Sequence, residues 1–399
     1  MRSRIATYIA ATTLCVSMGA PVRLAAKGKP APKKPEYTVI ILGTLGGAAS
    51  GANSINNRGW VTGVANLAGD QVAHAALWRN GEVVDLGTLG GPNSAVSWPV
   101  KNKKGVIVGI SETADVDPLG ETFSCAPFFG TPFTGHSCRG FLWRDDEITP
   151  LPPFPGGNNS YATGVNDRGQ AVGWAENGIH DTTCTFPQVL QFRAAIWGPG
   201  ENQMQELPPI LDDSSSAATA INNKGQVVGI SGRCDRAFGR FSAFHAVLWE
   251  NGAPTDLGNF GGVAWNTPTA INSHGQVAGF SDFPGDQAGG LNSHAFLWSK
   301  QNGLEDLKTL PGDAISLAFG INDRGQVVGQ SIGANGSHAF LWEDGVMKDL
   351  NDLVPSGTPV LFFANDVDDR GQIVGGALDA AGNSLAFVAV PDRGRHEGN

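Results

Sequence analysis

One phrase occurs seven times in this chain. It consists of Asn, two variable residues, Gly and a Val-rich segment that ends in a second Gly, as in Asn222 to Gly229. Successive copies begin 46 to 64 residues apart, and a period near 50 is typical of propeller blades and similar repeat arrays. The phrase opens at Asn56, Asn102, Asn166, Asn222, Asn272, Asn322 and, with Asp in place of Asn, at Asp368.

Each copy predicts a four-stranded antiparallel unit. Strand a ends in the repeat Asn, and a Gly such as Gly225 permits the positive φ of a tight turn into strand b. Strand c carries His-Ala-x-Leu-Trp, as in His245 to Trp249, and an Asn-Gly or Asp-Gly turn leads to strand d, which ends in Asp-Leu. Because strand c is apolar on both faces, we expect blades stacked around an axis.

The two ends of the repeat region complement each other. Residues Tyr37 to Leu42 read as a strand d that no other strand precedes, whereas the last strand c, Leu385 to Val390, has no strand d after it. Pairing these two segments would close the ring and remove an exposed sheet edge. The sequence therefore predicts an all-β fold, a seven-bladed β-propeller of four-stranded antiparallel blades that is closed by its N-terminal strand.

Over residues 37 to 390 the chain resembles the HAF-repeat family, a group of extracellular bacterial repeat proteins named for His-Ala-Phe. That motif stands at His294-Ala295-Phe296 and at His338-Ala339-Phe340. The phrases Asn-x-x-Gly-Gln-Val-x-Gly and Asp-Leu-Gly-Thr-Leu-Gly-Gly also match the family. The resemblance implies a repeat architecture outside the cytoplasm, but no particular activity.

The segments outside the repeats indicate export. Residues 1–26 are similar to a signal peptide, because Arg2 and Arg4 precede a short apolar stretch rich in small residues, whereas a membrane anchor would need about 20 strongly apolar residues. We expect a linker at 27–36, the propeller at 37–390 and a disordered tail at 391–399. The mature protein is expected to be secreted or periplasmic, monomeric and free of the membrane. A net charge of -10 without a basic stripe excludes a nucleic-acid surface.

Four cysteines remain once the predicted signal, with Cys15, is removed. All four fall in loops between strands b and c, and an even number in an exported chain predicts disulfides. Cys125 and Cys138 share one insertion and are expected to pair. Cys184 and Cys234 occupy equivalent loops of adjacent blades and are expected to join them; a bond from Cys125 to Cys184 would instead mean that the insertions cross.

The b–c loops of blades two, three and four are longer than the others. In a four-stranded meander they emerge on the same rim as the Gly-rich crossovers from strand d to the next strand a, and we call this the inserted rim. Loops on a rigid scaffold carry most binding residues, so any function is expected there. Aromatic residues in the largest insertion suggest a platform for a ligand, or alternatively a small core that tethers the insertion. The ligand-binding candidates are Phe123, Phe128, Phe129, Phe133, His136 and Asp181.

The sequence contains no recognised catalytic motif, and we expect no cofactor and no metal. Asp115 and Asp117 are too few for a Ca²⁺ site, and the recurrent His of strand c is interpreted as an architectural hydrogen-bonding residue. We favour a secreted binding or scaffolding module for an extracellular glycan or protein. The alternative is a polysaccharide hydrolase or lyase, which would need two carboxylates about 5 to 10 Å apart in a cleft. Acidic residues available for such a pair are Asp117, Glu121, Glu176, Asp181 and Asp235.

Overall fold

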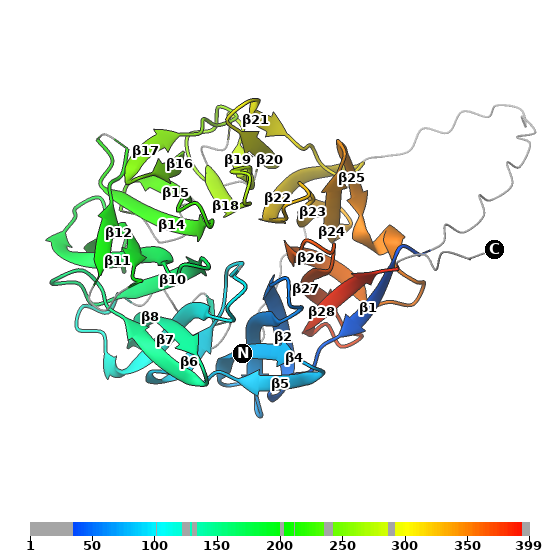
Figure 1. Ribbon diagram of the computed structural model, residues 1–399, viewed down its shortest axis with the longest axis horizontal. Coiled ribbons are helices and arrows are strands. Elements are labelled where there is room, and N and C mark those ends of the chain that lie inside the picture. Colours follow the sequence, from blue (N-terminus) through cyan, green and yellow to red (C-terminus); the bar gives the residue numbers. More distant parts are fainter. Residues whose placement is uncertain are drawn as a thin grey trace, which may run out of the picture. The chain divides into compact units, whose positions relative to one another are not determined.

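A computed structural model describes residues 35–100, 102–121, 128–129, 134–199, 203–210, 212–234, 242–285 and 292–392. These residues form seven four-stranded antiparallel sheets arranged as a β-propeller, which confirms the predicted fold (Figure 1). The predicted signal peptide and all but the last two residues of the linker lie outside the described residues, as does most of the predicted tail. Within the described part, no helix has the length and apolar character needed to cross a membrane.

The strands follow the predicted order from the axis outward in every blade. Blades one and two contain β2 (Gly46–Ile55), β3 (Val61–Leu67), β4 (Ala73–Arg79), β5 (Glu82–Asp85), β6 (Gly90–Ala95), β7 (Ile107–Val116), β8 (His136–Arg144) and β9 (Glu147–Leu151). Blades three and four contain β10 (Ser160–Val165), β11 (Ala171–His180), β12 (Leu190–Trp197), β13 (Met204–Leu207), β14 (Ser215–Ile221), β15 (Val227–Gly232), β16 (Ala243–Glu250) and β17 (Ala253–Asp256). Blades five and six contain β18 (Thr267–Ile271), β19 (Val277–Asp282), β20 (Ser293–Ser299), β21 (Gly303–Asp306), β22 (Asp313–Ile321), β23 (Val327–Gly333), β24 (Gly336–Glu343) and β25 (Val346–Asp349).

The seventh blade is assembled from both ends of the propeller. It contains β26 (Val360–Val367), β27 (Ile373–Leu378), β28 (Ser384–Pro391) and β1 (Tyr37–Ile41), after a 3-10 helix at Leu350–Leu353. Strand β1 pairs with β28 in the antiparallel register Tyr37 to Pro391 through Ile41 to Phe387, as expected from the complementary ends. The ring is therefore closed by hydrogen bonds, and β28 has no free edge.

The repeat Asn stabilises the turn that it opens. In blade four, Oδ1 of Asn222 accepts hydrogen bonds from the backbone N–H groups of Lys224 at 3.0 Å and Gln226 at 3.1 Å. Gly225 has φ 83°, a left-handed conformation that a residue with a Cβ adopts only at a cost. The first residue of the phrase makes the same pair of bonds in all seven blades.

The amide nitrogen of the same side chain reaches the next blade. Nδ2 of Asn222 donates to the backbone oxygen of Asn272 at 3.1 Å, and Asn272 donates to that of Asn322 at 3.1 Å. Equivalent bonds run from Asn166 to Asn222 and from Asn322 to Asp368. In blades three to six, one side chain thus stabilises its own turn and the neighbouring blade, which explains why these copies of the phrase use Asn.

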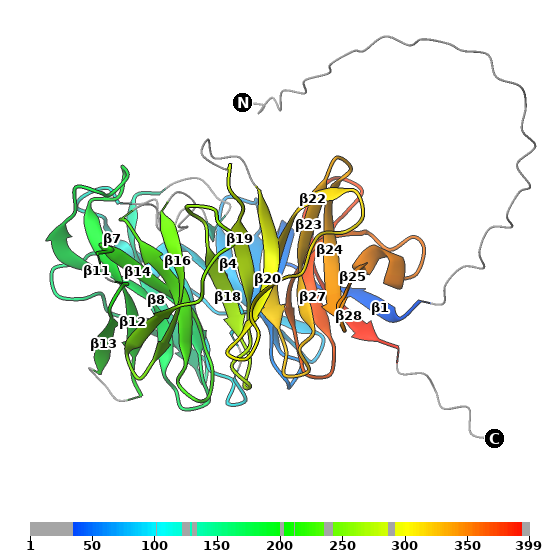
Figure 2. The same ribbon diagram turned by 90° about the horizontal axis from the view of Figure 1, so that it is seen from above.

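The residue after the repeat Asn forms a second belt around the axis. Its backbone N–H donates to the side chain of the corresponding residue in the following blade, as from Ser273 to Asp323 and from Asp323 to Asp369, at 2.8 and 2.9 Å. Figure 2 shows the blades from the side, with their turns gathered on two rims. We call the rim of these a–b turns the hairpin rim. The remaining links of this belt join Lys103 to Asp167, Asp167 to Asn223 and Asp369 to Asn57.

Strand c carries the expected architectural histidines. Nδ1 of His74, His245, His294 and His338 lies 2.8 to 3.2 Å from a carboxylate oxygen of the Asp that ends strand d. The rings are half-buried rather than fully buried, because 17 to 31% of each side chain is exposed. Each pair joins two strands of one blade, which supports the interpretation that the histidines are structural.

The belt on the hairpin rim predicts a stabilising substitution. Among the described residues, no hydrogen bond joins the Asn223 N–H to the side chain of Ser273. In the other links of the belt, the accepting side chain at this position is Asn or Asp. Ser273→Asn should supply the acceptor and raise the free energy of unfolding by about 1 kcal/mol. Chemical denaturation of Ser273→Asn beside Ser273→Ala measures the gain, and an Asn variant no more stable than the Ala variant contradicts it.

Candidate functional site

An aromatic cavity of about 290 Å³ lies where the blades meet, on the side of the inserted rim. Strands a and b supply most of its wall, through residues three or five positions before the repeat Asn and one position after the strand-b Gly. The aromatic members are Trp98, Phe128, Trp174, Trp265, Phe280 and Phe319, and the others are Asn53, Ser97, Pro99, Ala217, Thr219, Ile230, Thr267, Thr269 and Asn365. We call this the axial pocket. None of these described lining residues is charged.

One wall of the axial pocket is a packed aromatic cluster. Trp98 contacts Phe128 edge-to-face, with ring centroids 5.6 Å apart, and Trp174 at 6.1 Å. Tyr161 stacks on Trp174 at 4.3 Å and meets Phe128 at 4.8 Å. Such pairs stabilise one another beyond the area that they bury, so the rings on this wall have defined positions.

Trp265 lines the pocket in an unusual backbone conformation. Its φ is 57°, in the left-handed region that bulky residues rarely adopt, and its ring meets Phe280 edge-to-face at 5.4 Å. It precedes β18, on the crossover into blade five. Strained residues of this kind cluster at functional sites, where the surrounding structure keeps them in place.

Several polar side chains of the pocket wall already donate hydrogen bonds within the propeller. Oγ1 of Thr219 donates to the backbone oxygens of Val228 and Pro268, and Oγ1 of Thr269 has an equivalent pair of bonds. The amide nitrogens of Asn53 and Asn365 donate to backbone oxygens of adjacent strands. These groups join the blades, which leaves the pocket with a mainly apolar surface.

The two described phenylalanines of the insertion lie in different surroundings. Phe128 is half-buried and lines the axial pocket, as the platform hypothesis expects. Phe129 is only 4% exposed and packs in a core cluster with Cys138, as the small-core alternative expects. Phe123 and Phe133 lie outside the described residues.

Two other predicted candidates lie away from the axial pocket. Nδ1 of His136 lies 2.8 Å from the backbone oxygen of Thr113 within blade two. Asp181 accepts hydrogen bonds from the N–H and the hydroxyl of Thr183, at 2.8 and 2.7 Å. Neither side chain is among the residues that line the pocket.

Five of the six aromatic pocket residues were missed in the sequence. Equivalent positions in the other blades hold different residues, so the repeat pattern does not mark them. For three of the five, the offset from the repeat phrase is a usable signal, since Phe319 stands three residues before Asn322 and Trp174 and Phe280 directly follow a strand-b Gly. Trp98 and Trp265 share neither offset.

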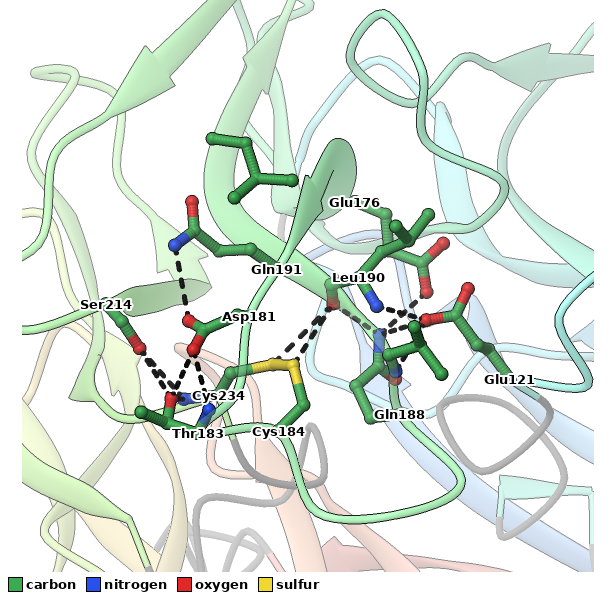
Figure 3. The surroundings of a disulfide bond; sticks show 12 residues. Glu121, Glu176, Asp181, Thr183, Cys184, Gln188, Leu190, Gln191, Ser214 and Cys234 are labelled. Carbon is green, nitrogen blue, oxygen red and sulfur yellow. Dashed lines mark hydrogen bonds between the residues drawn. A yellow bond between two sulfur atoms is a disulfide. The ribbon is translucent and has the colours of Figure 1, made fainter.

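A disulfide between Cys184 and Cys234 joins the insertions of blades three and four, as predicted (Figure 3). The two Cα atoms lie 4.2 Å apart, and the bond spans 50 residues of sequence. Cys138 is also in a disulfide, and its expected partner Cys125 lies outside the described residues. Asp181 lies near the first pair, but both sulfurs are bonded to each other, so these three residues do not form a metal site.

Buried carboxylates connect the blade-two insertion to blade three (Figure 3). Oε1 of Glu121 accepts hydrogen bonds from the backbone N–H groups of Val189, at 2.7 Å, and Leu190. Nε2 of Gln188 lies between the two acids, 3.3 Å from Glu121 and 2.9 Å from Glu176. Burial, with a smaller effect of the Glu121 carboxyl, raises the pKa of Glu176 to about 7.

These carboxylates do not form an open catalytic pair. Glu121 and Glu176 are 0% and 2% exposed, and Asp117 is also buried, where it accepts bonds from Leu119 N–H and Asn159 Nδ2. Asp235, the remaining acid considered for catalysis besides Asp181, lies outside the described residues. The described acids therefore hold loops in place, and the axial pocket contains none of them.

A second cavity, of about 230 Å³, lies on the axis at the hairpin rim. Its wall consists of the repeat Asn residues and the residues that follow them, including Asp167, Asp323 and Asp369. These three carboxylates accept the N–H groups of the inter-blade belt. The polar lining is thus explained by the scaffold.

Comparisons with known proteins identify the architecture alone. No family model matches the chain, and no curated protein matches it in sequence. Virginiamycin B lyase from Staphylococcus aureus is similar in structure, with a TM-score of 0.51 and 11% identity over 89% of this chain and 100% of that one. Acylaminoacyl peptidase from Pyrococcus horikoshii has a TM-score of 0.50 and 12% identity over 86% of this chain, but the match spans only 51% of the peptidase. At such identities the likeness shows the propeller fold and no activity.

The surroundings of Phe128 and Phe129 predict different outcomes for two neighbouring substitutions. Phe129→Ala should lower the free energy of unfolding by about 3 kcal/mol, because it empties a buried site. Phe128→Ala should have a smaller effect on stability and instead weaken ligand binding at the axial pocket. Chemical denaturation and a binding titration separate the two effects, and equal losses of stability would assign both rings to the small core.

The buried acids predict a pH-dependent stability. Because the pKa of Glu176 is raised from 4.5 to about 7, the folded state holds a proton that the unfolded state releases, and stability falls as pH rises through this window. Glu121→Gln keeps an acceptor for the Val189 and Leu190 amides and removes the neighbouring charge. It should therefore be more stable than the wild type at pH 8 by about 1 kcal/mol and equal to it at pH 4.

Chemical denaturation at the two pH values measures this difference. Glu147→Gln, at an exposed position in β9, is the matched control and should change little at either pH. A Glu121→Gln gain that is the same at pH 4 and pH 8 would contradict the electrostatic explanation.

Proposed function

We propose that this protein is an exported binding module that captures its ligand, a group on an extracellular glycan or protein, in the axial pocket. The observation that carries the proposal is the pocket itself, with six aromatic side chains and no charged residue among its described lining. A concave apolar site with few polar groups is the usual form of a ligand site. The strained Trp265 and the insertion residue Phe128 meet at this site from different blades.

Two further features support an extracellular location. The Cys184–Cys234 bond is of the kind that persists in oxidising compartments. The resemblance to the HAF-repeat family and the signal-like residues 1–26 point in the same direction. We infer from these that the protein acts outside the cytoplasm, as a monomer and without a cofactor.

A hydrolase or lyase has less support. Such an enzyme would need two accessible carboxylates in the cleft, whereas the described lining of the axial pocket has none. Of the acids considered for catalysis, Asp117, Glu121 and Glu176 are buried and Asp181 accepts hydrogen bonds from Thr183. Although the similar propellers include a lyase and a peptidase, identities of 11 and 12% transfer neither activity.

A glycan array and a binding screen with the purified full chain test the proposal. We expect saturable binding that Trp98→Ala weakens at least about tenfold, because pocket aromatics act as anchors. Val346→Ala, at an exposed position of the outer strand β25, is the control and should bind as the wild type does. Cleavage of a polysaccharide, or binding unaffected by pocket variants, would overturn the proposal.

A further inference from the structure

We propose that the axial pocket receives an uncharged aromatic side chain of a protein partner, a step that rests on the binding function proposed above. The pocket wall and the surface around the pocket each restrict what can occupy it. The first defines the chemistry of the inserted group, and the second defines the kind of molecule that presents it.

The wall favours an aromatic ring. Trp98, Phe128, Tyr161 and Trp174 already pack edge-to-face or stacked, with centroids 4.3 to 6.1 Å apart, and an inserted ring would extend the same packing. Trp265 also lines the pocket, from the crossover into blade five, and its ring lies edge-to-face on Phe280. A cavity of about 290 Å³ is at the small end of ligand sites, as a single inserted side chain requires.

The wall disfavours a sugar. A buried sugar needs several hydrogen-bonding partners to replace the water that it loses. Oγ1 of Thr267 is buried in the lining without a partner among the described residues, but it is a single group. Thr219, Thr269, Asn53 and Asn365 also line the pocket, but their hydroxyl or amide groups already donate to backbone oxygens of neighbouring blades. Using them for a ligand would break bonds between blades. The described lining also contains no charge that would pair with an ionic ligand.

The surface around the pocket favours a polypeptide. Of the ten large hydrophobic residues exposed in the described structure, seven lie on the b–c loops and crossovers of the inserted rim, or on the strand ends beside them. They are Val116, Leu119, Ile179, Phe186, Val263, Val360 and Leu378, with exposed fractions from 38 to 84%. These residues belong to blades two, three, five and seven, all on the rim of the pocket. A polypeptide that fills the pocket and continues over this rim can cover some of them, whereas a free aromatic molecule in the pocket would leave them all uncovered. A central aromatic anchor with apolar contacts around it is the usual arrangement of such interfaces.

The test selects random 12-residue peptides, displayed on phage, against the full chain. Bound phage are then counted on three proteins: the wild type, Trp265→Gly and Trp60→Ala. Glycine suits the positive φ at position 265, so Trp265→Gly removes the ring without backbone strain. Trp60 lies beside Arg58 and Arg79 in the a–b turn of the hairpin rim, so Trp60→Ala is a matched control for loss of a tryptophan.

We expect enriched peptides to share a Trp, Tyr or Phe and to bind Trp265→Gly at least about tenfold more weakly than the wild type or Trp60→Ala. Changing that aromatic residue of the peptide to Ala should have the same effect. Phe186→Ser, at a side chain 84% exposed, should weaken the peptides but not N-acetyl-tryptophanamide, which is too small to reach the rim.

Other outcomes overturn the inference. Peptides without a shared aromatic residue, or none enriched, contradict it. Binding of a neutral glycan or of tetramethylammonium that depends on Trp265, without peptide binding, would refute the aromatic side chain while the proposed binding function stands. Binding of none of these probes would refute both.

Discussion

The propeller depends on one side chain that fixes a turn in every blade and, in blades three to six, also joins the next blade. Oδ1 of the repeat Asn fixes the tight turn between the inner two strands, and Nδ2 of the same residue binds the next blade in blades three to six. A carboxylate can do only the first task. Asp368, in the seventh copy, accepts the two turn bonds but has no N–H to donate, so the junction between blades seven and one requires another solution.

That junction combines a bond specific to it with a bond of the recurring belt. Oδ2 of Asp366 accepts the backbone N–H of Ile55 at 2.9 Å, and, as in the belt, the N–H of Asp369 donates to Oδ1 of Asn57 at 3.0 Å. Further out, β1 completes the sheet of blade seven. The chain therefore closes where the repeat Asn is absent, by combining a strand from the N-terminal end with a carboxylate, Asp366, that accepts an N–H of blade one instead of donating to it.

The sequence predicts whatever recurs and misses whatever differs between blades. The turns, the His–Asp pairs, the strand order and the closing strand follow from a pattern present several times, and even the Cys184–Cys234 bond follows from equivalent loops. The axial pocket does not, because each of its aromatic residues occupies a position that holds something else in other blades. The left-handed conformation of Trp265 also depends on tertiary packing, as does the difference in burial between Phe128 and Phe129. Neither can be deduced from the neighbouring residues in the sequence. For the same reason, acids predicted as accessible on the rim are buried at Glu121 and Glu176.

Scaffold and site thus occupy different positions of the same strands. Residues at the repeat Asn and its turn are constrained by bonds within and between blades, whereas residues three and five places earlier face the axis and can vary. Blades four and five place small residues such as Ala217 and Thr267 there, whereas blade six places Phe319 there and blade three supplies Trp174 from the adjoining strand b. Seven blades that were identical at these positions would give a symmetric channel. Because small residues such as Ala217 and Thr269 stand beside large rings such as Trp174 at these positions, space is left among the rings. This asymmetry produces a pocket while the hydrogen bonds that close the ring stay unchanged.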